Sequence, residues 1–306
     1  MRLMVTGANG QVGWELGRIL QPLGQVIALD RSQCDLSRPE LLPGRVRDIK
    51  PDVIVNAAAY TAVDKAEQEE HLATTINSTA VGVLAEEARK AGILFVHYST
   101  DYVFDGEKPT PYSEDDAPHP INAYGRSKLA GEVALAAAGG AHLILRTSWV
   151  YAGRGRNFLL TVLRLARERV ELRMVDDQIG APTWARDIAD ATARIISAAH
   201  VELAQNKFAS AIFHLTASGM TSWFGFAKAI VDDAGHQHLL KQRLPRLIPI
   251  TSKDYPTPAS RPKNCRLSCE RVGERFGIAL PDWQRSLMRC TEQMTGQPFS
   301  SLSPGN

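Results

Sequence analysis

Three side chains of this sequence could together protonate a substrate carbonyl oxygen: Tyr124, Lys128 and Thr100. Tyr124 and Lys128 stand four residues apart in "NAYGRSKLAGE", so a helix would place the phenol and the ammonium on one face. A phenol is a weak acid at neutral pH unless a positive charge lies nearby. If a nicotinamide binds here, we expect Lys128 to bond its ribose and to lower the pKa of Tyr124. Tyr124 would then protonate a substrate oxygen that Thr100 holds. Each residue alone also fits a chance helical pair or a strand-end cap.

A glycine-rich turn precedes this group. "VTGANGQVGWEL" places Gly7, Gly10 and Gly13 between an expected strand and an expected helix. The spacing is a variant of the dinucleotide fingerprint: Gly7 permits a tight turn, Gly10 lets the backbone approach a pyrophosphate, and Gly13 permits close packing of helix on strand. The N-terminus of the helix would offer free N–H groups to the phosphates.

The coenzyme itself is left open between NADH and NADPH. Asp30 ends the second expected strand, where an acid binds the ribose diol and repels a 2′-phosphate, and this favours NADH. Arg31 beside it could instead pair with that phosphate. Asp35 and Leu36 are placed to flank the adenine, although Asp35 also fits an ordinary loop acid. The small residues of "NAAAYT" would let the coenzyme lie close to the backbone, with core packing as the alternative.

Short apolar runs alternate with helical patterns and predict the scaffold for these residues. "RLMVTG", "QVIALD", "DVIVNAA", "ILFVHYST" and "HLILRTS" are continuous rather than alternating, as in strands buried on both faces. Helices are expected around residues 11–20, 40–49, 69–91 and 122–138. We therefore predict an α/β fold with a Rossmann-type, doubly wound parallel sheet over residues 1–150. Residues 151–306 are expected to form a smaller, mixed α/β substrate region, with some segments returning to the sheet.

One segment of this second region is expected to be irregular. Five prolines fall within residues 245–262, which we predict to be mostly extended loop.

Composition excludes several classes of function. The chain has 306 residues, 44% of them hydrophobic, and a net charge of +2. That balance argues against nucleic acid and against an anionic membrane surface as partners. The four cysteines lack a CxxC pair, which argues against structural zinc or a disulfide framework. With no signal-like or membrane-spanning apolar run, a cytoplasmic location is expected.

The glycine turn, "YSTDYVF" and "YGRSK" resemble the extended short-chain dehydrogenase/reductase family. "DVIVNAAAYTAVDKAE", "LRTSWVYAGRGRNF", "DDQIGAPT" and "YPTPASRP" are similar to the members that reduce a 4-keto nucleotide sugar. The resemblance implies reduction of dTDP-4-dehydro-L-rhamnose to dTDP-L-rhamnose with NADPH or NADH, the last step in making that nucleotide sugar.

The resemblance also assigns site residues. It implies catalysis by Tyr124, Lys128 and Thr100. Those implied to bind the coenzyme are Gly7, Gly10, Gln11, Val12, Asp30, Asp35, Leu36, Ala59, Tyr60, Thr61, Tyr124 and Lys128. Those implied to bind the sugar nucleotide are Thr100, Asp101 and Trp149, with Asn157 at the diphosphate and Arg261 in a loop on the nucleotide side.

Local departures refine that expectation. Family dehydratases carry Thr-Asp-Glu where this chain has Thr100-Asp101-Tyr102, and the missing glutamate favours simple reduction. Family reductases are described with Mg²⁺ at a homodimer contact. Glu15 matches one ligand, but Arg186 falls where a second carboxylate is needed, which argues against the metal. That mode of dimerisation is left open, and a homodimer remains one of the alternatives. Cys265 stands where relatives tend to have serine.

Two other functions remain open. A non-catalytic regulatory subunit that binds NADP(H) would share the glycine turn and the fold. An epimerase, or a reductase of another nucleotide sugar, would share the catalytic residues but not the sugar-side motifs.

Overall fold

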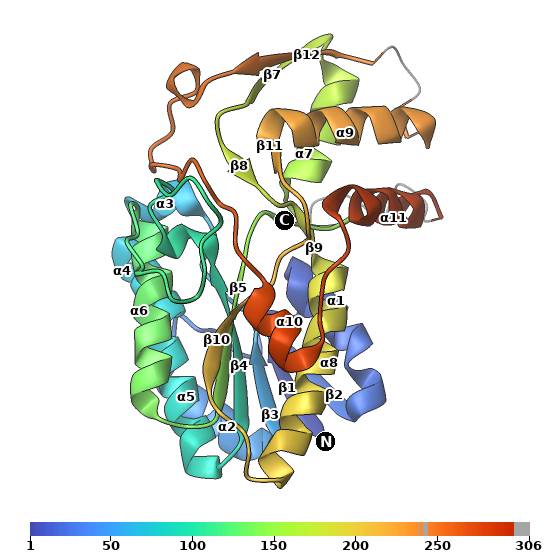
Figure 1. The fold of residues 1–306 in the computed structure, drawn as a ribbon. Helices are drawn as coiled ribbons and strands as arrows, with labels where there is room; N and C mark the ends of the chain where they lie inside the picture. The colour runs from blue at the N-terminus through green and yellow to red at the C-terminus, as the bar shows by residue number, and fades with distance from the viewer. Residues whose placement is uncertain (238, 241–243, 297–306) are drawn as a thin grey trace.

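Six parallel strands form the central sheet of the computed structural model, which describes residues 1–237, 239–240 and 244–296 (Figure 1). Their order across the sheet is β10-β5-β4-β3-β1-β2. The strands are β1 (Arg2–Thr6), β2 (Gln25–Leu29), β3 (Val53–Asn56), β4 (Leu94–Thr100), β5 (His142–Thr147) and β10 (Ala211–His214). All five apolar runs predicted as strands lie in this sheet, and the predicted Rossmann-type fold is confirmed.

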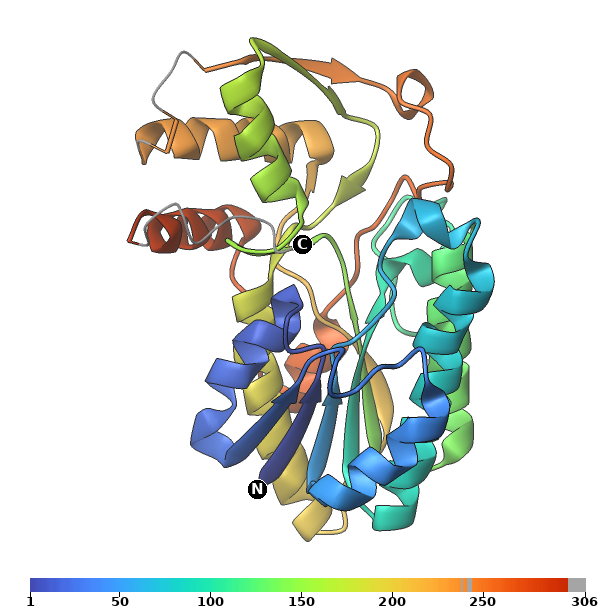
Figure 2. The same cartoon turned by 180° about the vertical axis from the view of Figure 1, so that it is seen from behind.

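Helices cover both faces of the sheet, because successive side chains of each strand point to opposite faces. Leu3 and Val5 of β1 pack in one core, and Met4 between them packs in the other. The first face carries α1 (Gln11–Ile19), α8 (Ala185–Ala204) and α10 (Glu270–Phe276); the second carries α2 (Leu42–Ile49), α5 (Ala80–Ala91) and α6 (Ala123–Ala138). The two views in Figures 1 and 2 show these layers.

The helix expected over residues 69–91 is interrupted. The chain forms α4 (Glu70–Thr74), a π-helical turn over Thr75–Thr79 and then α5, after a short α3 (Val63–Ala66). Such π-turns often occur at functional sites, and this one contains Asn77, which is described below. Shorter 3₁₀ turns lie at Gln21–Leu23, Pro39–Leu41, Asp101–Val103 and Ser252–Asp254.

A second group of elements stands above the carboxyl ends of the strands (Figure 1). It comprises the helices α7 (Phe158–Glu168), α9 (Trp223–His236) and α11 (Trp283–Thr295), and the strand pairs β7 (Glu171–Val175) with β12 (Arg246–Ile250), β8 (Ile179–Gly180) with β11 (Thr221–Ser222), and β6 (Val150–Tyr151) with β9 (Thr183–Trp184). Phe226, Ile230 and Leu287 belong to a core of its own.

The proline-rich segment is more regular than expected. β12 lies inside residues 245–262 and pairs in parallel with β7, although it contains Pro249. A proline lacks an N–H donor but is tolerated in a strand that has a neighbour on one side only, as β12 has.

The domain boundary at residue 150 stays a prediction. β10, α8 and α10 follow that residue in sequence yet pack with the central sheet. Among the described residues, no helix is both long enough and apolar enough to cross a membrane.

Candidate active site

The glycine turn forms a cradle with no room for side chains. Gly7 has a φ of 74°, and a Cβ on it would lie 2.8 Å from the nitrogen of Ala58. A Cβ on Gly13 would overlap the carbonyl of Gly7. Gly10 caps α1 without a side-chain hydrogen bond, so the first turn of the helix, with Gln11 and Val12, keeps N–H groups for an anion. The cradle fits the pyrophosphate of a dinucleotide.

Asp30 lies beside this cradle. Asn9 of the turn donates to its carboxylate across 3.3 Å, and the backbone N–H and the hydroxyl of Ser32 donate across 2.9 and 2.6 Å. These bonds, led by the Ser32 hydroxyl, lower the pKa of Asp30. Arg31, the next residue along the chain, is largely exposed and pairs with Asp35 at 3.4 Å. A cation therefore lies next to the Asp30 carboxylate in sequence.

The adenine contact expected of Leu36 has little support. Its side chain is 3% exposed and packs in the core with Leu29 and Val46, so little of it is open to a ligand. Asp35 is partly exposed, and its carboxylate accepts hydrogen bonds from the backbone and hydroxyl of Ser37 at 2.9 and 2.8 Å.

The segment with Ala59, Tyr60 and Thr61 follows β3 and reaches the cradle, since Ala58 touches Gly7. Asn77 of the π-helical turn holds it in place. Its amide oxygen accepts from the Tyr60 N–H at 2.8 Å, and its amide nitrogen donates to the Tyr60 carbonyl at 3.0 Å and to the hydroxyl of Ser127 on α6 at 2.9 Å. Sequence reasoning missed Asn77, because the expected regular helix gave it no special position.

The expected catalytic residues meet at the carboxyl end of β4. Thr100 is the last residue of that strand, and Tyr124 lies in the first turn of α6. Asn122 starts α6 there by accepting a hydrogen bond from the Gly125 N–H at 2.8 Å. Burial raises the pKa of Tyr124 to about 12. The neighbouring Thr100 side chain lowers this pKa, and the Asp101 carboxylate raises it.

The expected effect of Lys128 on the phenol is wrong for this structure. The Lys128 ammonium donates to the Tyr98 carbonyl at 2.6 Å and lies 3.3 Å from Nε2 of His97, and burial lowers its pKa to about 8. The raised pKa of Tyr124 has burial as its main cause. A phenol with this pKa keeps its proton at neutral pH and can donate it to an alkoxide, which is a stronger base.

Asp101 lies next to the phenol in the 3₁₀ turn after β4. The Thr100 hydroxyl donates to one of its oxygens at 3.0 Å, and the other oxygen is buried without a partner. Burial raises the pKa of Asp101 to about 6, although Cys265, Thr100 and Ser148 lower it. Cys265 is buried beside it, and burial together with the Asp101 carboxylate holds the pKa of the thiol well above its ordinary value. Asp101 therefore presents an unsatisfied acceptor within the site.

Trp149 is held in a strained conformation, with a φ of 48°. Its ring stacks on Trp223, and a Cβ on Gly180 would lie 2.6 Å from the Cε2 atom of its indole. Trp223 in turn donates to Gln178 at 3.1 Å. Neither Trp223 nor Gly180 was expected in the site, since both come from elements far from Trp149 in sequence.

Arg261 reaches the same region. It pairs with Asp64 at 2.8 Å, lies 5.9 Å from the ring centre of Tyr102, and keeps one buried guanidinium nitrogen without a partner. The ring of Tyr102 also contacts that of Tyr124 edge-on, at 5.7 Å. These contacts connect Arg261 to Tyr124.

Asn157 is already engaged within the protein. It caps α7 by accepting from the Leu160 N–H at 3.0 Å, and its amide nitrogen donates to Gln11 and to the Ala152 carbonyl, both at 2.8 Å. Its expected contact with the diphosphate stays a prediction and would require some of these bonds to be exchanged. Gln11 is thereby fixed between the cradle and the loop before α7.

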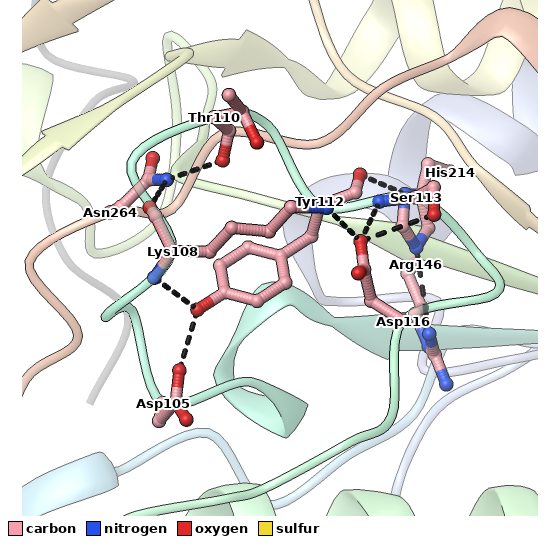
Figure 3. Close-up of polar contacts among 9 residues, drawn as sticks. All are labelled: Asp105, Lys108, Thr110, Tyr112, Ser113, Asp116, Arg146, His214 and Asn264. Carbon is pink, nitrogen blue, oxygen red and sulfur yellow. Dashed lines mark hydrogen bonds and ion pairs between the residues drawn. The ribbon is translucent and has the colours of Figure 1, made fainter.

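The loop after β4 is tied to the segment that carries Arg261 and Cys265 (Figure 3). Asn264 donates to the carbonyls of Lys108 and Thr110 at 2.6 and 2.8 Å. Within the loop, the Tyr112 hydroxyl donates to Asp105 at 2.5 Å, and Lys108 pairs with Asp116 at 2.6 Å. These bonds fix the loop after β4 to the segment that carries Arg261 and Cys265.

A magnesium ion does not fit the residues around Glu15. Glu15 is 7% exposed, and burial raises the pKa of its carboxyl group. Arg186, Arg18 and Arg154 lower that pKa by their positive charge, and the acidic neighbour Asp190 raises it. A divalent cation would be repelled by these guanidinium groups. In the described part of the chain, no three His, Cys, Asp or Glu side chains converge as metal ligands would.

Comparison with known proteins identifies the family. The model described as "RmlD substrate binding domain" matches residues 1–295. A dTDP-4-dehydrorhamnose reductase of Burkholderia thailandensis is 54% identical over 298 residues, 97% of this chain and 100% of the relative. The chain belongs to the RmlD family of dTDP-4-dehydrorhamnose reductases. A dTDP-4-dehydrorhamnose reductase of Escherichia coli strain K12 is 47% identical over 299 residues, 96% of this chain and 98% of the relative.

Solved structures agree with this placement of the chain among RmlD proteins. A dTDP-4-dehydrorhamnose reductase of Bacillus anthracis, crystallised with NADP, superposes with a TM-score of 0.86 at 33% identity and covers 95% of this chain and 99% of its own. A UDP-glucose 4-epimerase of Thermus thermophilus, crystallised with NAD, superposes with a TM-score of 0.75 at 20% identity, covering 97% and 100%, and shares the fold alone.

Proposed function

We propose that this protein uses NADPH or NADH to reduce the 4-keto group of dTDP-4-dehydro-L-rhamnose, which gives dTDP-L-rhamnose. The observation that supports the proposal is that Thr100 ends β4 next to Tyr124 of α6. The glycine turn that follows β1 lies at the same edge of the parallel sheet, and its Gly7 and Gly13 have no room for a side chain. Reduced nicotinamide, when bound, supplies the hydride.

The chain's own residues have distinct roles in the proposal. Thr100 holds the substrate carbonyl oxygen, and Tyr124 gives its proton to that oxygen as negative charge develops there. Lys128 binds the ribose of the coenzyme. Asp101 and Trp149 hold the sugar, and Arg261 lies toward the nucleotide.

The experiment that tests the proposal measures oxidation of NADPH and of NADH by the purified protein. It compares dTDP-4-dehydrorhamnose with other 4-keto nucleotide sugars, and it identifies the product. Turnover should be fastest with dTDP-4-dehydrorhamnose and should give dTDP-L-rhamnose. A protein that binds NADPH but turns over none of these ketones would instead be a regulatory subunit.

A further inference from the structure

A row of four buried polar side chains runs across three neighbouring strands to the catalytic helix. Thr6 on β1 donates to the Asn56 amide oxygen at 2.5 Å, and the Asn56 amide nitrogen lies 3.1 Å from Nδ1 of His97 on β4. Nε2 of His97 lies 3.3 Å from Nζ of Lys128. All four side chains are at most 2% exposed. Polar groups buried this deeply must satisfy one another.

The charge on Lys128 determines which nitrogen of His97 carries a proton. Burial and the Lys128 charge hold the pKa of His97 well below its ordinary value, so the imidazole is neutral, with one donor and one acceptor. An ammonium can only donate, so Nε2 accepts and Nδ1 is protonated. A half-turn of the Asn56 amide then brings its oxygen to Nδ1 and its nitrogen to Thr6. A neutral Lys128 amine could also accept a hydrogen bond from Nε2, so it would no longer fix the tautomer.

We propose that His97 is a positioning residue for Lys128, whose ammonium it holds through an unprotonated Nε2, while Asn56 and Thr6 satisfy its other nitrogen. The inference rests on the proposed function, in which Lys128 binds the coenzyme ribose. With the Tyr98 carbonyl on one side at 2.6 Å and Nε2 on the other, two of the three ammonium donors are fixed. The third remains for a ribose hydroxyl.

The charged groups near Lys128 are paired with one another and do not replace His97 as its positioning partner. Glu132, one turn further along α6, favours the charged form of Lys128, but Arg146 on β5 binds both of its oxygens, at 2.9 and 2.6 Å. Arg146 itself lies 3.5 Å from His214, whose pKa burial lowers to about 3 (Figure 3). Glu132 is thus neutralised by its own partner. Burial lowers the pKa of Lys128 to about 8, so its charge changes within an accessible pH range.

The first test uses the wild-type protein and needs no substrate. In ¹⁵N-histidine spectra at pH 6, the His97 signals should show a protonated Nδ1 and an unprotonated Nε2. Both should shift together as Lys128 loses its proton at higher pH. A proton found on Nε2 at pH 6 would overturn the proposal, because that nitrogen could not accept from an ammonium.

The second test compares variants by NADPH binding across pH. His97→Leu removes the acceptor and should weaken binding at least about tenfold, the effect expected of one charge-assisted hydrogen bond. NADPH affinity should fall at high pH as Lys128 loses its proton. In His97→Leu this fall should begin at a lower pH, because the ammonium has lost a favourable partner. His97→Gln restores an acceptor, so its NADPH affinity should stay within about threefold of wild type across the pH range. Thr192→Val is the matched control, since it breaks a buried hydrogen bond to Tyr98 on the other face of β4.

The outcomes separate this proposal from the proposed function. Equal losses in folded His97→Gln and His97→Leu would show that His97 only fills space, and an unchanged His97→Leu would show that it does not hold Lys128. If His97→Leu does not fold, the proposal is tested by the His97 tautomer of the wild type and by NADPH binding to His97→Gln. Turnover of the keto sugar by wild type tests the reductase function alone.

Discussion

Trp149 and Trp223 lie face to face, with ring centroids 3.5 Å apart and ring planes within 9° of parallel. Trp149 has the unusual φ of 48°, and Gly180 leaves the space that its indole fills. A strained residue persists only where its surroundings over-determine it, and here the stack on Trp223 and the close approach to Gly180 hold the indole. Trp149 thereby lies next to Cys265, which in turn neighbours the Asp101 carboxylate.

Replacing Trp149 by alanine should weaken binding of the sugar nucleotide selectively. The change removes a wall of the sugar site but touches neither the glycine cradle nor Lys128. We expect KM for the keto sugar to rise at least about tenfold, or ~1.4 kcal/mol, and KM for the coenzyme to stay within about twofold. Steady-state kinetics with each substrate varied will measure both. A parallel rise in the two KM values would mean that the variant disturbs the whole site.

Replacing Tyr124 by phenylalanine should abolish proton donation while leaving the coenzyme bound. We expect kcat to fall at least about a hundredfold, as for loss of a general acid, with NADPH affinity nearly unchanged. Tyr151→Phe is the matched control, because its hydroxyl is buried without a partner and lies outside the proposed site. If Tyr124→Phe turned over at the control's rate, the phenol would not be the proton donor.

Much of this site could be predicted because its signals are local in sequence. The glycine spacing, the four-residue step from Tyr124 to Lys128 and Thr100 at a strand end each follow from one short segment and the element it forms. The carboxyl ends of parallel strands lie along one edge, and this brings those segments together.

The rest depends on contacts between distant segments. His97 looks like one more residue of a buried strand, and its role emerges only when β1 and β3 place Thr6 and Asn56 beside it. The direction of the Lys128 ammonium could not be predicted either, because a carbonyl of β4 competes with the phenol for it. Burial then decides the pKa of Tyr124, and burial is a property of the folded chain.

Asp30 should set the preference between the two coenzymes. Its carboxylate would accept from a ribose diol and repel a 2′-phosphate, whereas exposed Arg31 would attract that phosphate. For Asp30→Asn we expect the ratio of kcat/KM for NADPH over NADH to rise about tenfold, since one like-charge repulsion is removed. Arg31→Ala should lower the ratio. If both variants move it in the same direction, these two residues do not select the coenzyme.

Asp101 should make the fold less stable as pH rises, because its folded pKa of about 6 lies above that of an unfolded aspartate. Between about pH 4 and pH 6 the folded state holds a proton that the unfolded state has lost, so the free energy of unfolding falls with rising pH. A shift of about two pKa units corresponds to a loss of about 3 kcal/mol above pH 6. Asp101→Asn cannot ionise and should escape that loss.

The test is urea unfolding of wild type and Asp101→Asn between pH 4 and pH 7. Asp101→Asn should gain stability relative to wild type as pH rises, by up to about 3 kcal/mol at pH 7, while binding the keto sugar more weakly. Asp116→Asn is a control of opposite sign: its bond to Lys108 lowers the pKa of Asp116, so the wild type should be favoured at pH 7 and the difference should shrink on acidification. A pH-independent difference for Asp101→Asn would mean that this carboxyl titrates normally. Burial of the Asp101 carboxylate would then not reduce the free energy of unfolding at neutral pH.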